Sequence, residues 1–342
     1  MRLDRLFSAA EVKKAMFNMH CLKSPGTDGF TADSFQAYWE DVEELVVDSV
    51  QQFLRTGNTL KEWNQTLLVL ISKVRVPERE GQFRPISLCN TVYKCISMCM
   101  VNRLKNILPG LISENQHAFI PSRYMEDNIL LSHELMHLIN SKKGSNFTAI
   151  KIDMSKAYDR VDWRTSGHFV PQCGLRQGDP LSPYLFIFCM DIHSIMLSLA
   201  EDINQFKGLK VSRRSPSISY LFFADDAMLF FKADEESYLC INVILLRFGK
   251  ASGQQLNLQK SFIKFSPGFD NNKRLVLKSI LSMPETDNMG THLGAPIDIQ
   301  GKKSLAFQFL VDRVSDKLVS CASLNLSQAA KLVLINTVLV SI

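Results

Sequence analysis

The feature that most constrains this chain is residues 220–231, where two adjacent acids, Asp225 and Asp226, interrupt an otherwise uncharged run rich in aromatic side chains. Each apolar flank has the length and composition of a β-strand, and the small and acidic residues between the flanks suit a tight turn. The stretch therefore predicts a β-hairpin with both acids at its tip. Two like charges beside so much apolar surface are costly unless a cation compensates them. The hairpin is either a metal-binding site or an ordinary solvated turn between two core strands, and the stretch alone leaves both open.

The composition allows a large core, because 46% of the 342 residues are apolar, enough for one elaborate α/β domain or two to three smaller ones. The net charge of +5 permits a nucleic-acid partner without requiring one. The eight cysteines form no Cys-x-x-Cys and the first residues carry no apolar signal segment, which predicts a reducing, intracellular setting. Charged residues interrupt the two most apolar stretches, residues 86–101 and 184–200, so we expect a soluble protein without a membrane span.

The periodicity of apolar residues predicts a chain of mixed helices and strands. Ser8 and Glu11 have the spacing of a capping box, Thr31 or Asp33 can cap the second helix, and Ser182 can cap an apolar helix that begins with a proline. We expect helices over residues 8–20, 31–55, 92–108, 125–140, 183–200, 235–251, 302–319 and 327–342, and strands over residues 66–72, 83–88 and 148–153 and within 253–266, with 284–296 irregular. No internal repeat or low-complexity linker divides the chain, so we expect one contiguous body.

Three charged residues outside the hairpin are candidates for the same site. Lys73 and Arg84 flank the predicted pair of strands 66–72 and 83–88, and they either bind phosphate oxygens or are solvated charges at strand ends. Asp153 ends a short strand, where an acid is often a helix cap or turn residue. It becomes a third carboxylate of the site if its strand lies beside the hairpin.

A second candidate site is the run His133-Glu134-Leu135-Met136-His137 on a predicted helix. Two histidines at i and i+4 with a glutamate between them can bind zinc and supply a general base, as in metallopeptidases. The third position after His137 is not the glycine that one extension of this motif requires. The alternative is a helix face with two half-exposed histidines.

Taken in order, six motifs resemble the reverse transcriptases of LINE-type, non-LTR retrotransposons, especially those of plant genomes. They are PGTDG at 25–29, FRPISL at 83–88, Asp153 followed by Ala157-Tyr158, GLRQGDPLSP at 174–183, FADD at 223–226, and Lys260. The resemblance covers nearly the whole chain. It implies an α/β (α+β) fold of the right-hand polymerase type, with residues 1–145 as fingers and fingers-palm helices, 146–285 as palm, and 286–342 as the start of a truncated thumb.

The same resemblance implies RNA-directed DNA polymerase chemistry on two Mg²⁺ ions, with Mn²⁺ as a possible substitute. Asp153 and Asp225 would carry both ions and Asp226 would support them, since such ions activate the 3′-hydroxyl and neutralise the leaving pyrophosphate. Lys260 matches a lysine proposed to protonate that pyrophosphate.

Further matches implied by the resemblance concern the substrates, which would be an RNA template, a DNA primer and deoxynucleoside triphosphates. Lys73 and Arg84 would grip the triphosphate, and Tyr158 would exclude a ribose 2′-hydroxyl. Gln177 would contact the incoming nucleotide near its sugar, and Gly294 would lie in the turn that supports the primer. No membrane partner is expected, protein partners stay open, and the resemblance implies the nucleus or the cytoplasm.

The chain departs from the family pattern after Trp163. Only ten residues separate Trp163 from Gly174, where the family has a helix and a further palm strand. Ten residues cannot hold both elements at about 1.5 and 3.3 Å per residue. We therefore expect a palm shortened near residues 163–174, and we expect the family's endonuclease and later thumb to be missing. Cys173 also stands where a basic residue is usual.

These departures leave three hypotheses for the function. The first is a working RNA-directed DNA polymerase. The second is a catalytically dead relic of a retroelement with residual nucleic-acid binding. The third and most distant is a zinc metallopeptidase that uses His133, Glu134 and His137.

Overall fold

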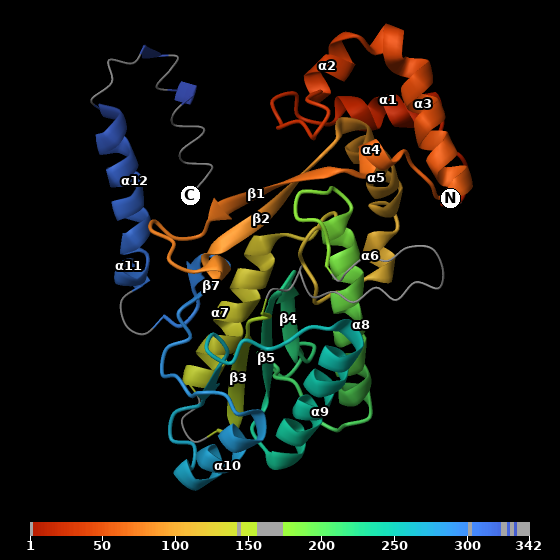
Figure 1. The fold of residues 1–342 in the computed structure, drawn as a ribbon. Coiled ribbons are helices and arrows are strands. Elements are labelled where there is room, and N and C mark those ends of the chain that lie inside the picture. Colours follow the sequence, from red (N-terminus) through yellow and green to blue (C-terminus); the bar gives the residue numbers. More distant parts are fainter. Residues whose placement is uncertain are drawn as a thin grey trace.

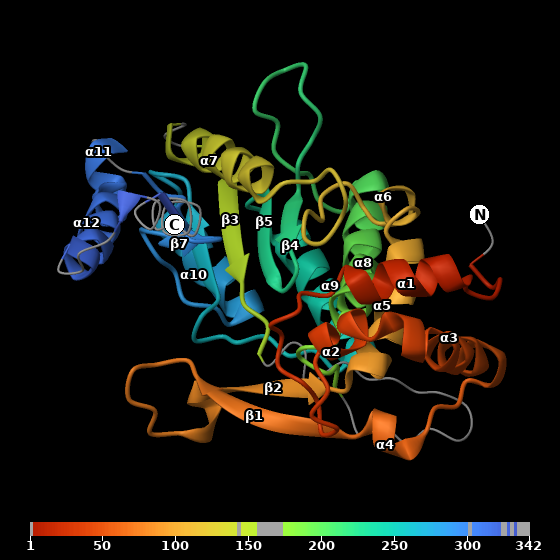
Figure 2. The same cartoon turned by 90° about the horizontal axis from the view of Figure 1, so that it is seen from above.

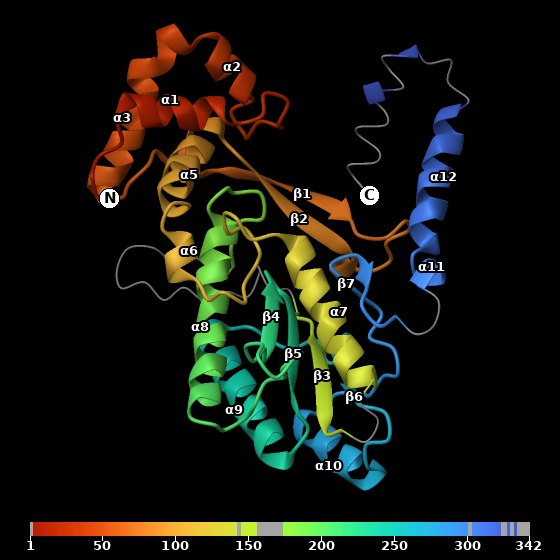
Figure 3. The same cartoon turned by 180° about the vertical axis from the view of Figure 1, so that it is seen from behind.

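The computed structural model describes residues 3–141, 145–155, 174–299, 303–322, 327–328 and 332–333. Within these residues, a four-stranded sheet flanked by helices forms one body, and a largely helical N-terminal part with a two-stranded hairpin lies beyond one end of the sheet (Figures 1 and 3). Helices and strands are mixed along the chain, which agrees with the predicted α/β (α+β) class.

The four-stranded sheet has the order β4-β5-β3-β6, and all of its neighbouring strands are antiparallel. Its strands are β3 (Phe147–Ile152), β4 (Tyr220–Phe223), β5 (Asp226–Lys232) and β6 (Phe262–Phe265). The aromatic run at 220–231 thus forms the predicted hairpin, and the predicted strand before Asp153 is its neighbour in the sheet. Both predictions are confirmed.

Helices cover both faces of this sheet, as the view from above in Figure 2 shows. They are α7 (Met125–Ser141), α8 (Ser182–Asp202) and α9 (Glu235–Ser252). Side chains of β5 alternate between the faces: Leu229 and Phe231 pack in the cluster that includes α8 and α9, while Met228 and Phe230 pack with α7. The period of two explains why the strand reads as continuously apolar, because both of its faces are buried.

The N-terminal part has a separate apolar cluster that includes Met16, Trp39 and Val50. Its elements are α1 (Ala9–Phe17), α2 (Ala32–Ala37), α3 (Trp39–Thr56), α4 (Lys61–Asn64), α5 (Thr91–Leu104) and α6 (Leu108–Leu111). The capping box of Ser8 and Glu11 is present as predicted. The predicted helix over 31–55 is two helices, because Tyr38 leaves the helical conformation at φ −107° and ψ 30°. The predicted helix over 92–108 likewise ends at Leu104, and α6 follows.

Two strands of the N-terminal part form the predicted hairpin, β1 (Thr66–Ser72) and β2 (Phe83–Cys89), joined through the short 3₁₀ helix η1 (Glu80–Gln82). The hairpin lies beyond the end of the sheet at which β4 ends (Figures 1 and 3). Residues 67–71 of β1 are all exposed although all are apolar. This strand therefore contributes little to the core and presents its side chains outward.

The start of α8 differs from the sequence expectation. Leu181 occupies the N-cap position and Ser182 is already helical. The carboxylate of Asp179 accepts hydrogen bonds from the Leu181 backbone N–H and the Ser182 hydroxyl, both at 3.3 Å. An acid just before the helix thus satisfies the free N-terminal donors in place of the serine.

The C-terminal part contains a second small hairpin where an irregular segment is expected. Its elements are α10 (Asn271–Leu281), β7 (Thr291–His292), β8 (Ala295–Pro296), α11 (Lys303–Ala306) and α12 (Gln308–Ala322). A buried ion pair between Lys264 of β6 and Asp298 ties this segment to the sheet. The predicted helix over 327–342 lies almost wholly outside the described residues.

Helix α8 is the one helix in the described part of the chain that is long and apolar enough to cross a membrane by length and composition. Half of its apolar window is buried inside the fold, and core helices of soluble proteins meet the same criteria.

Candidate active site

Two residues, Ala224 and Asp225, form the turn at the tip of the central hairpin. The register pairs Phe223 with Asp226, so the turn is shorter than the four residues suggested by the sequence, and Asp226 begins β5. Ala224 has a φ of 55°, in the left-handed region that costs a non-glycine residue about 1–2 kcal/mol. Such a turn needs contacts from outside the hairpin to hold it.

The side chain of Gln116 supplies one of these contacts. Its Oε1 accepts hydrogen bonds from the backbone N–H of Ala224 at 3.1 Å and from that of Ala118 at 3.0 Å, and the residue is fully buried. The segment around Gln116 also pairs with β4 through the Phe222 backbone, whose N–H donates to Asn115 and whose carbonyl accepts from His117. The turn that carries Asp225 is thus fixed from the outer edge of the sheet.

The register between β3 and β5 brings a third carboxylate to the same end of the sheet. Ile152 pairs with Ala227, so Asp153, the next residue, emerges beside Asp226. Asp153 raises the pKa of both Asp225 and Asp226 through the repulsion of like charges. The sequence expectation that the strand of Asp153 lies beside the hairpin is therefore met.

Asp153 is also held from its other side by residues 257–261. The Asn257 side-chain amide donates to Asp153 Oδ2 at 3.0 Å, and the Asp153 backbone N–H donates to Ser261 Oγ at 3.1 Å. Lys260 lies in the same segment and its side chain is exposed. The segment therefore supports the acid at the end of β3 directly, while Lys260 reaches solvent from it.

The electrostatics of the two hairpin acids disfavour their charged forms. Asp225 is exposed at the tip of the hairpin, but the protein around its carboxylate displaces part of its water; this desolvation is the main cause of its raised pKa, and the charge of Arg84 opposes it. Burial also raises the pKa of Asp226, the charge of Asp225 adds to this, and Lys151 opposes it. A divalent cation would relieve both the desolvation and the mutual repulsion.

The three carboxylates have the right chemistry for a hard divalent cation, since carboxylate oxygens are the ligands that Mg²⁺ and Mn²⁺ prefer. In the part of the chain that the structure describes, however, no group of three or more His, Cys, Asp or Glu side chains is arranged so that it could hold a metal ion. One oxygen of Asp153 is engaged by Asn257 instead. The metal assignment stays a prediction.

The two candidate cations of the β1–β2 hairpin, Lys73 and Arg84, lie in different settings. Arg84 is exposed on β2, and its charge lowers the pKa of Asp225, so it lies on the side of the carboxylates. Lys73 is also exposed, but its Nζ donates to the Gly81 carbonyl at 3.2 Å within its own hairpin. Arg84 is therefore within electrostatic range of Asp225, while the Lys73 ammonium is engaged within its own hairpin.

Gln177 lies in a loop that pairs with the strand of Arg84. The Ser87 backbone N–H donates to the Gln177 carbonyl at 2.7 Å. Gly178 follows with a φ of 117°, and a Cβ there would lie only 2.5 Å from the Ser87 carbonyl oxygen. The glycine is needed for this close approach, which holds Gln177 and Arg84 on neighbouring segments.

The loop of residues 25–29 packs in a similar way on Asn90, the residue that follows β2. Its Thr27 hydroxyl and its Asp28 backbone N–H donate to the side-chain carbonyl of Asn90 at 3.2 and 3.4 Å. A Cβ at Gly26 would lie 1.9 Å from the same oxygen. The glycine-rich loop is therefore part of the structure around the hairpin.

Gly294 lies in the turn of the β7–β8 hairpin. Leu293 and Gly294 have φ values of 52° and 82°, so this two-residue turn has positive φ at both positions, as a type I′ turn requires. The hairpin is held against the sheet by Lys151 Nζ, which donates to the Thr291 carbonyl. On the other side, His292 Nε2 lies 2.9 Å from the Asn128 side-chain oxygen.

Tyr158, the predicted sugar gate, and the predicted shortening near residues 163–174 lie outside the described residues, apart from Gly174 itself.

Several residues that support the site carried no signal in the sequence: Gln116, Asn128, Lys151, Asn257 and His292. Each acts through a contact with a segment distant in the chain.

The zinc alternative is not supported. His133 Nε2 lies 2.7 Å from the Pro296 carbonyl oxygen, a contact that uses the ring nitrogen best exposed for a metal. No third ligand joins His133, Glu134 and His137 within the described residues. In this motif His133 contacts the β7–β8 hairpin, Leu135 and Met136 pack in the core beneath α7, and Glu134 and His137 are exposed.

Several of the proteins similar in sequence are named as products of transposons or retrotransposable elements. The chain is 26% identical over 316 residues, 81% of its own length, to the Retrovirus-related Pol polyprotein from type-2 retrotransposable element R2DM of Drosophila melanogaster, and covers 28% of that protein. It is 29% identical over 161 residues to the Transposon TX1 uncharacterized 149 kDa protein of Xenopus laevis, covering 47% of this chain and 12% of that protein. An uncharacterized mitochondrial protein of Arabidopsis thaliana is 50% identical over 66 residues, which are 19% of this chain and 54% of that protein.

The chain therefore spans between 12% and 54% of the length of these relatives. The resemblance to LINE-type elements is confirmed at the level of the family by these relatives and by two further polyproteins of retrotransposable elements, from Nasonia vitripennis and Bradysia coprophila. The family described as "Reverse transcriptase (RNA-dependent DNA polymerase)" matches residues 76–168 and 161–310, which together make up more than half of the chain. The chain belongs to the reverse transcriptase family.

Proposed function

We propose that this chain is the polymerase domain of a LINE-type reverse transcriptase, which extends a DNA primer along an RNA template by two-metal nucleotidyl transfer. The observation that carries the proposal is the strand register that sets Asp153 beside Asp225 and Asp226 at one end of the sheet. Arg84 reaches the same end from a separate hairpin. Three carboxylates and a facing cation are the groups that such a reaction needs.

In this proposal residues 1–145 are the fingers and fingers-palm helices, 146–285 the palm and 286–342 the start of the thumb. The N-terminal helices have an apolar cluster of their own, as fingers would, while α7 packs on the sheet, as a fingers-palm helix would. The hairpin of β7 and β8 follows the palm, and its tether to Lys151 supports a role for Gly294 beside the primer.

Asp153 and Asp225 would hold the ions, with Asp226 in support, because these acids are adjacent and the two hairpin acids are desolvated. Bound Mg²⁺, or Mn²⁺ in its place, would activate the primer hydroxyl and neutralise the leaving pyrophosphate. Asn257 and Gln116 would orient the ligands by holding Asp153 Oδ2 and the Ala224–Asp225 turn.

The nucleotide would lie between the β1–β2 hairpin and the sheet. Arg84 would bind the triphosphate with its planar guanidinium, and Gln177 would face the sugar from the loop that pairs with β2. Lys73 would need to leave the Gly81 carbonyl to join Arg84. Lys260 is exposed and free to deliver a proton to the departing pyrophosphate, and Tyr158 would exclude the 2′-hydroxyl.

One observation favours the second candidate, a catalytically dead relic that still binds nucleic acid. The family matches this chain in two segments that overlap at residues 161–168, a range that includes the first half of the ten-residue interval at which we expect a shortened palm. Catalysis of this kind depends on positioning, and a misplacement of about 1 Å can cost about 10²-fold in rate.

Primer extension on an RNA template with Mg²⁺ separates the two candidates. The matched pair is the unmodified chain and Asp225→Asn, and a third chain carries a family-like palm segment inserted after Trp163. Extension by the unmodified chain that Asp225→Asn abolishes supports the polymerase. If only the chain with the insertion extends primers, and all three chains bind RNA equally, the result supports the relic. If none of the three chains extends the primer or binds RNA, the result contradicts both the polymerase and the relic.

A further inference from the structure

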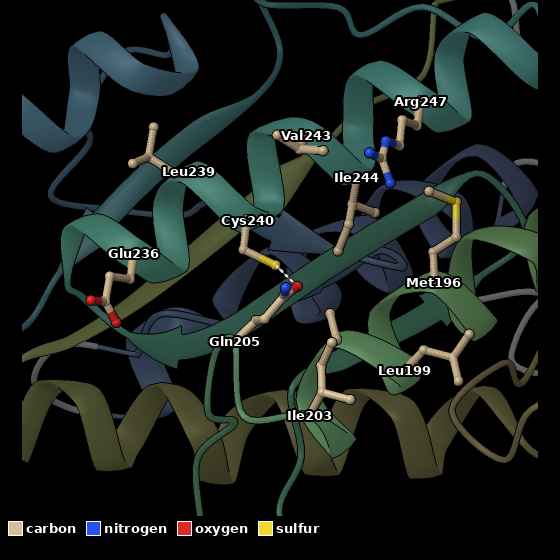
Figure 4. A pocket seen from close by; sticks show the side chains of 11 residues that line it. Met196, Leu199, Ile203, Gln205, Glu236, Leu239, Cys240, Val243, Ile244 and Arg247 are labelled. Atoms are coloured by element: carbon tan, nitrogen blue, oxygen red, sulfur yellow. Dashed lines mark hydrogen bonds between the residues drawn. The ribbon is translucent and has the colours of Figure 1, made fainter.

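Helices α8 and α9 leave a groove of about 700 Å³ between them on the outer side of the sheet (Figure 4). Its walls are mostly apolar and open to solvent. Leu199 on α8 and Ile203 at its C-cap are 58% and 67% exposed, and Leu239 and Val243 on α9 are 49% and 44% exposed. Single exposed apolar side chains are common on proteins, but several of them gathered on one concave face usually mark a contact surface.

The charged residues of this groove lie at its two ends. Glu236 and Arg247 point outward from α9 on either side of the apolar stretch (Figure 4). Eleven residues at about 1.5 Å each place them about 16 Å apart along the helix axis. Within the described part of the chain neither side chain makes an ion pair or a side-chain hydrogen bond. Both charges are available to a partner.

This face of α9 is complementary to its own reversed copy. Reversal about the midpoint of the stretch exchanges Glu236 with Arg247, Leu239 with Ile244, and Cys240 with Val243. An antiparallel copy would therefore set acid against base at both ends and apolar against apolar between them. A parallel copy would set Glu236 against the partner's Glu236, which is repulsive. The charges select one orientation.

We propose that the α8–α9 groove is the interface of a symmetric dimer of this chain, in which α9 of each copy lies antiparallel against α9 of the other. A two-fold contact requires a self-complementary patch, and this patch is self-complementary in charge and in polarity. An apolar centre with charged residues at its rim is the usual anatomy of such an interface. Leu199 and Ile203 of α8 widen the apolar centre on each copy.

Sedimentation velocity of the full chain over a concentration series tests the proposal. The unmodified chain is expected to shift from monomer to dimer. Arg247→Glu and Glu236→Arg, each alone, place like charges at both ends and are expected to weaken dimerisation at least tenfold. The double variant restores both pairs and is expected to dimerise again. Lys273→Glu, an exposed reversal on α10, is the matched control and should not change the association.

The thiol of Cys240 gives an independent readout, because it lies near the proposed two-fold axis and is half-buried in the monomer. Its maleimide labelling should slow as the concentration rises, while labelling of Cys21 in the N-terminal part should not. Peptide mass spectrometry distinguishes the two thiols. If a charge reversal unfolds the chain, Val243→Lys adds a charge at the centre of the groove and should abolish the dimer.

Three results would overturn the proposal. The first is a monomer at every concentration with constant labelling of Cys240. The second is a dimer that neither single reversal weakens, since the contact would then lie elsewhere. The third is a monomer that floats with phosphatidylcholine vesicles and whose Cys240 is protected by them, since the groove would then face lipid.

Discussion

The side-chain carbonyl of Gln116 accepts a hydrogen bond from the backbone N–H of Ala224, the residue that precedes Asp225. The two residues are 108 positions apart, and Ala224 has a positive φ that its own turn does not favour. The Nε2 of Gln116 is buried without a hydrogen-bond partner in the described structure, at a cost of about 1–3 kcal/mol. The carbonyl therefore has a role that offsets this cost, and that role is to hold the turn.

Gln116→Met tests this role, because methionine keeps the shape and removes the acceptor. We expect the free energy of unfolding to fall by about 1–2 kcal/mol, since the N–H groups of Ala224 and Ala118 lose their partner. If the chain extends primers, kcat should fall by about 10²-fold with little change in KM for the nucleotide, because the turn carries Asp225.

The control is Gln36→Met, which removes two hydrogen bonds of similar kind, from Gln36 Nε2 to the carbonyls of Met16 and Met19, in the N-terminal cluster. It should lower stability by a similar amount and leave kcat unchanged. Equal effects of the two variants on kcat would mean that Gln116 acts through stability alone.

Asp225→Asn should raise the stability of the metal-free protein and abolish primer extension. Partial desolvation, together with the charge of Asp153, raises the pKa of Asp225, so its ionised form is less stable in the folded chain than in the unfolded one. Its contribution is therefore greatest at low pH and is lost as the pH rises through the folded pKa. Removing the charge should raise the melting temperature at pH 7 and reduce the fall in stability with rising pH.

Differential scanning calorimetry with and without Mg²⁺ checks this prediction. Mg²⁺ should raise the melting temperature of the unmodified chain and not that of Asp225→Asn, because a ligand stabilises only the form that binds it. Asp48→Asn, at an exposed site on α3, is the control and should behave like the unmodified chain. An Asp225→Asn variant less stable than the parent in metal-free buffer would contradict the argument.

The sheet and its hairpin could be predicted because their signal is local. The runs on either side of Asp225 are buried on both faces, so every residue in them is apolar and the strands stand out. The strand that ends before Asp153 is similarly apolar. What the sequence could not give is the register, which depends on hydrogen bonds between strands about 75 residues apart and on contacts such as the one from Asn257 to Asp153.

Two expectations from local spacing were not met, because other contacts engage the same groups. His133 and His137 have zinc-site spacing, but His133 contacts a carbonyl more than 160 residues away. Ser182 has the position of an N-cap, but Asp179 satisfies the donors first. Local sequence patterns identify candidate ligands and caps, and the contacts made in the folded chain determine which of them have that role.

Arg103 shows how completely a buried cation can be satisfied, and Arg103→Lys should be strongly destabilising. All of its guanidinium donors are used: Nε and Nη2 bind the two oxygens of Glu11, and the remaining donors bind the carbonyls of Leu3, Arg5 and Leu6. A lysine has three donors and no planar fork, so it would leave buried acceptors unpaired. We expect a loss of about 3–5 kcal/mol in the free energy of unfolding, measured by urea denaturation.

Arg5→Lys is the control for this prediction, because Arg5 also contacts Glu11 but is 59% exposed, and it should cost no more than about 1 kcal/mol. The contact with Arg103 lowers the pKa of Glu11 to about 2. The contribution of this pair is therefore complete above the ordinary pKa of a glutamate and is lost as the pH falls toward 2. Arg103→Lys should weaken that part of the acid dependence, whereas Arg5→Lys should retain it.

His193 is the opposite case, a buried polar ring with no partner, and His193→Phe should stabilise the chain. Its side chain is fully buried, stacks on Phe248 with ring centroids 4.7 Å apart, and has no hydrogen-bond partner at either nitrogen in the described structure. Burial lowers its pKa to about 3, so the folded chain holds it neutral. Protonation of His193 therefore favours the unfolded chain. The contribution of the neutral ring to stability is complete above the unfolded pKa of about 6.5 and is lost as the pH falls toward 3. Phenylalanine should raise the free energy of unfolding by about 1–3 kcal/mol at pH 7 and flatten its decline between pH 6.5 and 4.

His292→Phe is the matched control. His292 is equally buried and its pKa is lowered to about 4, but its Nε2 contacts Asn128, so its loss should destabilise the chain. Urea denaturation of the two variants across this pH range separates them, and a destabilised His193→Phe would show that its nitrogens are satisfied in solution.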